Sequence, residues 1–283
     1  MTDLLRIASV SFVNARPLTY GFEAGPFRDG ARIRYEAPSA IPELLNEVRA
    51  DVGLIPSIAW AELHDAVLLP ELCIGAQQRA RSVLLASRVP IDRVRRIALD
   101  SASRTSAALV RILMADRGRH DIVYDEQPAA LPAMLRDHEA ALIIGDPALT
   151  ADLAGLDVID LGVAWFEATG LPFVFAVWAA RTGARLPDGV RPFVESRRLG
   201  LASLPAIARE FSPRLGIPAG AIESYLRTDL HYSLGSRELE ALTLFHRRAH
   251  ELGLTPRHRP PVFLEAPFLE PAIPAPDPAR MQP

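Results

Sequence analysis

Three hydroxyl side chains stand together where the sequence predicts the start of a helix. Residues 96–100 have the pattern of a short apolar strand, and residues 107–114 have the pattern of a helix. The turn between them contains Ser103, Thr105 and Ser106. A helix N-terminus offers free N–H groups and a partial positive charge to carboxylates and phosphates. Because a helix cap uses one hydroxyl, three in one turn indicate that at least one of them faces an anionic ligand.

A second polar turn follows the first expected strand, residues 6–10. It contains Asn14, and a helix is expected to begin at Arg16. Asparagine is common in turns for local reasons, so its type alone assigns no function. In the other turn, Arg104 would clamp a carboxylate if it faced the ligand and would otherwise be solvated. The shared order of strand, polar turn and helix indicates two similar halves.

Strand and helix patterns alternate after both turns, as in a parallel sheet covered on both faces. The first series continues with a strand at 32–36, a helix from Ser39 and a strand at 52–55, and the second with a strand at 122–125, a helix near 128–136 and a strand at 141–145. Ligands of such open sheets bind beyond the carboxyl ends of the strands. Both polar turns should therefore line a cleft.

Two apolar segments, residues 82–87 and 170–178, bracket the second series. Two crossings of this kind are expected in a hinged protein of two lobes, with hinges near residues 84–92 and 172–182. The expected organisation is a first lobe of residues 1–86 plus 180–270, a second lobe of residues 87–179, and a Pro-rich tail of residues 271–283. Helical patterns at 189–201, 204–211, 220–230 and 236–252 are expected to pack on the first lobe.

Composition excludes several classes of chemistry. All 31 basic residues are arginine, which excludes Schiff-base lysines, covalent pyridoxal phosphate attachment and the phosphate-loop lysine. The single cysteine, Cys73, permits no internal disulfide and fits a small buried residue better than a catalytic thiol. His246 and His250 have a metal-like i, i+4 spacing, but their charged neighbours favour a solvated helix face.

Charge and hydropathy also limit the classes of partner that the protein can have. The net charge is −3 and no block of arginines is interleaved with aromatic residues, so we expect no nucleic-acid partner. No apolar run approaches the roughly 18 residues that span a bilayer, so we expect no membrane partner. Asp3 stands where a signal peptide would be basic, which favours a cytoplasmic protein.

Five segments in register resemble the chorismate dehydratase family of the futalosine route to menaquinone. They are residues 10–18 (VSFVNARPL), 81–83 (RSV), 99–106 (LDSASRTS), 144–149 (IGDPAL) and 165–178, where Trp165 precedes TGLPFVFAVW. The resemblance covers residues 6–252 and implies an α/β, two-lobed type II periplasmic-binding-protein-like fold, each lobe a mostly parallel sheet flanked by helices. It implies a cytoplasmic hydro-lyase that converts chorismate to 3-[(1-carboxyvinyl)oxy]benzoate and water without metal or cofactor. It does not indicate an oligomeric state.

The resemblance also implies roles for residues of this chain. Asn14 is expected near the leaving hydroxyl and Ser82 in the cleft, both as catalytic residues, although Ser82 could equally be a buried strand serine. The expected substrate-binding residues are Ser11, Arg16, Ser103, Arg104, Thr105, Ser106, Gly145, Asp146, Gly170 and Leu171. Asp146 could instead cap a helix over residues 147–153.

The matched segments contain no histidine, cysteine or lysine, so the proton acceptor is not evident. Asp146, a backbone-held water and the substrate's own enolpyruvyl carboxylate are the candidates. We favour the substrate carboxylate because it lies beside the proton, which leaves orientation and electrostatic stabilisation to the protein. The expected partner is thus a small dicarboxylate. Two alternatives stay open: a non-catalytic binding protein for a small carboxylate, and the sister dihydroxynaphthoate synthase, whose amino-terminal motif differs.

Overall fold

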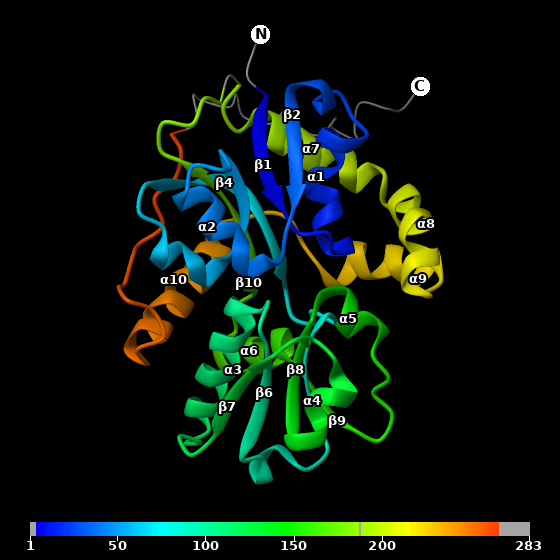
Figure 1. Ribbon diagram of the computed structural model, residues 1–283, viewed down its shortest axis with the longest axis vertical. Helices are drawn as coiled ribbons and strands as arrows, with labels where there is room; N and C mark the ends of the chain where they lie inside the picture. The colour runs from blue at the N-terminus through cyan, green and yellow to red at the C-terminus, as the bar shows by residue number, and fades with distance from the viewer. Residues whose placement is uncertain (1–3, 187, 266–283) are drawn as a thin grey trace, which may run out of the picture.

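Two lobes, one above the other in Figure 1, make up the computed structural model. The structure describes residues 4–186 and 188–265. Each lobe contains a five-stranded mixed sheet flanked by helices, which confirms the expected α/β class. The Pro-rich tail expected over residues 271–283 lies outside the described residues. None of the described helices combines the length and the apolar character that crossing a bilayer requires.

The first lobe is built on the strand order β2-β1-β3-β10-β4. β1 pairs in parallel with β2 and β3, while β10 is antiparallel to β3 and β4, so four of the five strands share one direction. The strands are β1 (Leu5–Ser9), β2 (Ala31–Tyr35), β3 (Val52–Pro56), β4 (Ala66–Ala76) and β10 (Phe173–Arg181). The helices of this lobe are α1 (Arg16–Glu23), α2 (Ile41–Asn46), α7 (Arg191–Ala202), α8 (Leu204–Leu215) and α9 (Ala219–Ser224).

The second lobe repeats this arrangement in the order β7-β6-β8-β5-β9. β6 is parallel to β7 and β8, and β5 is antiparallel to β8 and β9. The strands are β5 (Val83–Ser87), β6 (Arg96–Asp100), β7 (Val123–Gln127), β8 (Ala140–Ile144) and β9 (Asp157–Asp160). The helices are α3 (Arg104–Asp116), α4 (Leu131–Asp137), α5 (Gly145–Thr150) and α6 (Leu161–Thr169). The shared topology agrees with the two similar halves expected from the sequence.

The pairing of the strands places the lobe boundaries at other residues than expected. The boundary at 86/87 cuts through β5, which pairs with β8 along its whole length, and the boundary at 179/180 cuts through β10, which pairs with β3 and β4. Ladder hydrogen bonds hold each of these strands to one sheet, so neither strand can contain the hinge. We therefore propose that the chain crosses between the lobes at residues 77–82 and 170–172, ahead of each strand.

Strand β4 was not predicted from the sequence, for a local reason. Its pattern is interrupted by Pro70, and Glu71 has a φ of 65°. The pairing of β4 with β10 shifts register twice, as at β-bulges. Proline is tolerated here because β4 is the edge strand of the sheet. The segment before the tail covers this edge: Leu68 N–H donates to the Val262 carbonyl at 2.7 Å, and Leu264 N–H donates to the Leu68 carbonyl at 2.8 Å.

Helix α10 (Ser236–Glu251) does not pack on the first lobe alone, contrary to expectation. Leu242 belongs to the apolar core of the first lobe, whereas Phe245 and Ala249 belong to the core of the second. At its outer side Arg248 forms an ion pair with Asp116 of α3 at 2.7 Å. The helix therefore packs against both lobes.

Only one of the two histidines of α10 lies on a solvated face, although both were expected there. His250 is exposed, as expected for a solvated face, but the side chain of His246 is only 2% exposed. His246 Nε2 lies 2.9 Å from the carbonyl oxygen of Ser57, in the turn that follows β3. Burial lowers the pKa of His246 to about 4, and the hydrogen bond to Ser57 opposes this shift only in part. His246 is thus a neutral core residue.

The buried His246 should make stability sensitive to acid. The pKa of His246 is lower in the folded than in the unfolded protein. The contribution of neutral His246 to the free energy of unfolding is therefore complete above about pH 6.5 and is lost as the pH falls toward 4. The loss should be on the order of 3 kcal/mol in the free energy of unfolding. Urea unfolding between pH 7 and 4.5 should show a smaller loss for His246→Gln than for the wild type. Substitution of the exposed His120 by glutamine should leave the full pH dependence; equal profiles for all three proteins would contradict the assignment.

Candidate functional site

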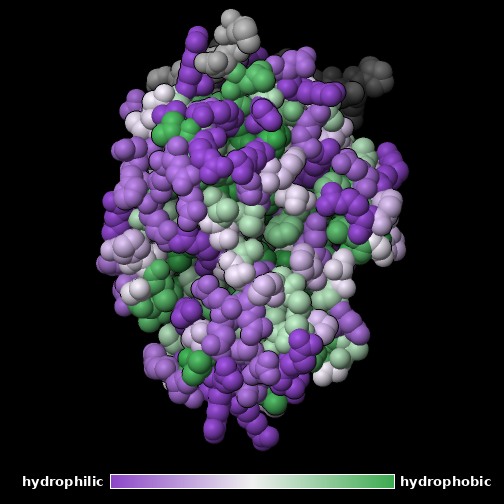
Figure 2. Space-filling model, in the orientation of Figure 1, coloured by the Kyte–Doolittle hydropathy of each residue, from purple (hydrophilic) through white to green (hydrophobic). Residues whose placement is uncertain are grey.

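A cavity lies between the lobes, where the carboxyl ends of strands from both sheets converge. Figure 2 shows hydrophilic residues over most of both lobes and pale to green residues gathered at the middle of this face. The lining combines apolar and polar side chains from both lobes: Val10, Phe12, Asn14, Pro38, Leu54, Pro56, Ile74, Ser82, Val83, Ala102, Ser103, Arg104, Thr105, Ser106, Ile144, Gly145, Phe175, Ala176 and Leu230. The polar turns after β1 and β6 thus face one space.

Most of the expected site residues line this cavity. They are Asn14, Ser82, Ser103, Arg104, Thr105, Ser106 and Gly145. Five others lie outside it, namely Ser11, Arg16, Asp146, Gly170 and Leu171. Direct substrate contact by these five residues stays a prediction.

Ser11 and Arg16 border a neighbouring hollow on the first lobe. Arg16 begins α1, and its guanidinium pairs with Glu23 on the same helix and with Glu210 of α8 at 3.2 Å. Two carboxylates already satisfy its charge, so Arg16 joins α1 to α8 and does not face the cavity. Ser11 is exposed.

Asp146 joins the two lobes. Its Oδ1 accepts a hydrogen bond from the Val13 N–H at 2.9 Å, across the boundary between α5 and the turn after β1. Burial raises the pKa of this carboxyl, and the Val13 N–H lowers it in part. Its side chain does not cap α5. The expected helix cap is therefore wrong, and an inter-lobe contact takes its place.

Gly170 and Leu171 have a structural role at the end of α6. Gly170 has a φ of 71° and terminates the helix in the left-handed conformation that glycine favours. Arg237 of α10 donates to its carbonyl at 2.6 Å, and Leu171 N–H donates to Thr169 Oγ1 at 3.1 Å. The loop lies at the second crossing and faces α10.

The N-terminus of α3 presents hydroxyl and N–H groups to the cavity. Ser103 occupies the cap position, yet its side chain makes no capping hydrogen bond, and it is 4% exposed. Ser106 lies one turn along the same face of the cavity wall. The first-turn N–H groups of a 13-residue helix have no partner within the helix. Ser103, Ser106 and these N–H groups form a set of donors suited to a carboxylate.

The other two polar residues of this turn are engaged with the first lobe. Thr105 Oγ1 accepts the Ile58 N–H at 3.3 Å, and the guanidinium of Arg104 pairs with Glu62. Arg104 is therefore not an unpaired clamp, although it lines the cavity mouth. Both contacts join α3 to the turn Ser57–Glu62 and help to hold the lobes together.

A small polar cluster beside the same cavity consists of Asn14, Ser82 and Tyr225. Asn14 Oδ1 is buried and has no hydrogen-bond partner among the described residues. Ser82 is 1% exposed, and its Oγ accepts the Tyr225 O–H at 2.7 Å. Burial raises the pKa of Tyr225 far above its ordinary value, against the opposing hydrogen bonds of Ser82 and Asn14, so Tyr225 is a neutral donor. The sequence did not single out Tyr225, because a tyrosine inside a helical pattern looks like any core residue.

Apolar side chains also line the cavity. Phe12 and Phe175 were also missed, although both lie inside segments that carry the family resemblance. With Leu54, Pro56 and Ile144 they offer flat surfaces suited to a ring. Apolar walls with a few convergent polar groups are typical of small-ligand sites.

Gly145 closes one wall and should not tolerate a side chain. Its φ is 62°, and a Cβ there would lie 2.6 Å from the Phe12 ring. Gly145→Ala should therefore lower the free energy of unfolding by about 2–4 kcal/mol and displace Phe12. Gly118 is the matched control, because its φ is 71° and nothing lies within 4 Å of an added Cβ. Gly118→Ala should cost about 1 kcal/mol in urea unfolding. Equal losses for both variants would show that the Phe12 contact does not matter.

Two α/β lobes around a central ligand cavity define a protein of the periplasmic-binding-protein fold. Solved structures agree: a protein of Archaeoglobus fulgidus has a TM-score of 0.72 at 19% identity, covering 88% of this chain and 98% of that one. The periplasmic aliphatic sulphonate binding protein of Escherichia coli has a TM-score of 0.66 at 20% identity, with both chains fully covered. At these identities the likeness shows the fold alone.

The sequence relationship is more specific. A model of the menaquinone biosynthesis family matches residues 5–251, so the chain belongs to that family. It is 30% identical to the chorismate dehydratase of Thermus thermophilus over 80% of this chain and 88% of that protein. It is 25% identical to the chorismate dehydratase of Campylobacter jejuni over 87% of this chain and 97% of that protein.

Proposed function

We propose that this protein is a cytoplasmic hydro-lyase that converts chorismate to 3-[(1-carboxyvinyl)oxy]benzoate and water. The observation that supports this most directly is that one cavity is lined both by the N-terminus of α3, whose hydroxyl and N–H groups suit an anion, and by Asn14 and Ser82. The relatives named chorismate dehydratase support the same substrate.

The cavity matches the chemical groups of chorismate. The substrate is a small ring with two carboxylates, a hydroxyl and an enol ether. Ser103, Ser106 and the N–H groups of α3 would bind a carboxylate, and Phe12 and Phe175 would enclose the ring. Asn14 and Ser82 are then left for the hydroxyl at the opposite side.

The reaction needs one proton acceptor and one group that helps the hydroxyl leave. The ring C–H beside the ether breaks, its electron pair forms the last double bond of the aromatic ring, and the C–O bond to the hydroxyl breaks. We assign the proton to the substrate's enolpyruvyl carboxylate, from which it reaches the leaving oxygen as water forms. Asn14 and Ser82 would donate hydrogen bonds to that oxygen as charge develops on it, and such donors stabilise the transition state more than the ground state.

Asp146 is unsuited to the role of base in this arrangement. Its carboxylate lies outside the cavity lining and accepts the Val13 N–H. Its contact instead supports a closed cleft, which would exclude water from the reacting atoms.

The experiment that tests the proposal is product formation by chelator-treated protein supplied with chorismate alone. Continued formation of the aromatic product would support elimination driven by the substrate and these side chains. Activity that disappears with the chelator and returns with a metal would contradict it. Chorismate that is bound but unchanged would favour the alternative of a binding protein.

A further inference from the structure

The chain segment that presents Ser82 has an unusual backbone. It runs through the first crossing between the lobes, ahead of β5. Arg81 has a φ of 62°, and Ser82 N–H donates to the Ala80 carbonyl at 2.7 Å, which makes residues 80–82 a γ-turn of the positive-φ kind. This conformation costs a non-glycine residue free energy and persists only where neighbouring contacts fix it.

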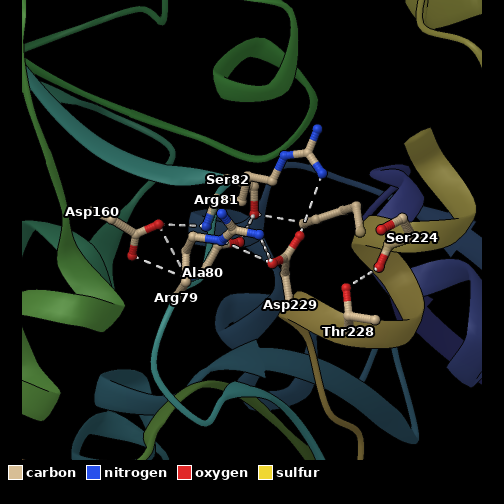
Figure 3. Close-up of polar contacts among 9 residues, drawn as sticks. Arg79, Ala80, Arg81, Ser82, Asp160, Ser224, Thr228 and Asp229 are labelled. Carbon is tan, nitrogen blue, oxygen red and sulfur yellow. Dashed lines mark hydrogen bonds and ion pairs between the residues drawn. The ribbon is translucent and has the colours of Figure 1, made fainter.

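Contacts from the second lobe fix the backbone of this turn. The Asp160 carboxylate accepts the N–H groups of Ala80 at 3.0 Å and Arg81 at 2.6 Å, as Figure 3 shows. The same carboxylate caps α6 by accepting the Gly162 and Val163 N–H groups. On the far side, Gly145 N–H donates to the Ser82 carbonyl at 2.8 Å.

Contacts from the first lobe reach the side chains of the same turn. They come from the π-helical turn Tyr225–Asp229, which follows α9. At one end of it Tyr225 donates to Ser82 Oγ. At the other end Asp229, which is 4% exposed, pairs with Arg79 at 2.6 Å and with Arg81 at 3.4 Å (Figure 3). Isolated π-turns inside helical segments are frequent at functional sites.

The direction of the Tyr225 hydrogen bond decides what Ser82 can do. Because Tyr225 O–H occupies a lone pair of Ser82 Oγ, the serine's own proton must point elsewhere. Among the described residues its one acceptor is the Ala80 carbonyl at 3.5 Å, which is long for a hydroxyl donor. The proton is therefore available to a ligand oxygen in the cavity.

We propose that Tyr225 is a positioning residue, which orients the Ser82 hydroxyl as a donor toward the leaving oxygen of the substrate. This inference rests on the proposed function. Tyr225 is fully enclosed, is not part of the cavity lining, and acts on the reaction through Ser82. The nearby carboxylates Asp146 and Asp229 further disfavour its phenolate, so it remains a donor throughout the working pH range.

The test is a double-mutant cycle in kcat with the full-length protein and chorismate. Y225F should lower kcat about tenfold with little change in KM, because the ring packing stays and one hydrogen bond is lost. In the S82A background, Y225F should have no further effect, because no serine hydroxyl remains to be oriented. A tyrosine with a merely structural role would lower kcat by the same factor in both backgrounds, and that result would overturn the proposal, as would a wild-type kcat for Y225F.

Tyr232 supplies a matched control. It is also buried in the first lobe, but its hydroxyl has no hydrogen-bond partner among the described residues. Y232F should retain wild-type kcat and thermal stability. If the wild type formed no product, the proposed function would fail by itself, and the crystal structure of Y225F would decide the positioning role. A displaced Ser82 Oγ would support that role, and an unchanged position would overturn it.

Discussion

Asn14→Asp should abolish turnover and binding together. The variant keeps the shape of the side chain but places a negative charge in the cavity. The amide oxygen of Asn14 is buried there and has no hydrogen-bond partner in the described part of the chain. A dianionic substrate would then meet a like charge in a site of low dielectric, which costs several kcal/mol. The same exchange at the exposed Asn46 should leave both properties unchanged. Calorimetry with the product would measure the loss of affinity, and single-turnover rates with chorismate would measure the loss of turnover.

Asn14→Ala separates the catalytic contribution of Asn14 from binding. Because its hydrogen bond should strengthen as the C–O bond breaks, kcat should fall about 10²–10³-fold while product affinity largely survives. A near-native rate for Asn14→Ala would show that Asn14 is a structural turn residue, and the catalytic assignment would be wrong.

Ser106→Asp should eliminate substrate binding without harm to the fold. A carboxylate in the first turn of a helix is stabilised by the helix dipole, but Ser106 is only 4% exposed. The cost of burying the charge offsets this gain, so the free energy of unfolding should stay close to that of the wild type. At the same time it would occupy the anion site at the start of α3 and repel the substrate carboxylate, which should weaken product affinity about a hundredfold or more. Ser106 suits this test better than Thr105, whose hydroxyl already accepts the Ile58 N–H.

Ser236→Asp is the control for that exchange. Ser236 is exposed at the first turn of α10, so its substitution should raise stability slightly through the helix dipole but leave affinity unchanged. If Ser106→Asp bound the product as tightly as the wild type, the carboxylate would have to bind elsewhere in the cavity.

The architecture was largely predictable from local patterns. Periodicity located the strands and helices around residues 96–116, because a buried strand, a polar turn and an amphipathic helix differ in spacing. The lobe boundaries were not predictable, since β5 and β10 are apolar up to their last residues, Ser87 and Arg181, and such strands fit either sheet equally well. Only the hydrogen-bond ladders show that β5 belongs to the sheet of β8 and that β10 belongs to the sheet of β3 and β4.

Site residues were predictable only where neighbouring residues along the chain form part of the site together. The turn Ser103–Ser106 was found because its hydroxyls exceed what a cap requires, and the structure brings it to the cavity. The contacts of Asp146 and Arg16 could not be predicted, because their partners, the Val13 N–H and Glu210, are 133 and 194 residues distant along the chain. Tyr225 is joined to Ser82 across 143 residues, and no local pattern encodes such a contact.

The loss of water from chorismate in this cavity is tested most directly by identifying the product. Purified protein incubated with chorismate should yield a product lighter by one water, identified by mass analysis as 3-[(1-carboxyvinyl)oxy]benzoate, while Asn14→Asp prepared in the same way yields none. Recovery of chorismate unchanged from a folded wild-type protein that binds it would contradict the account.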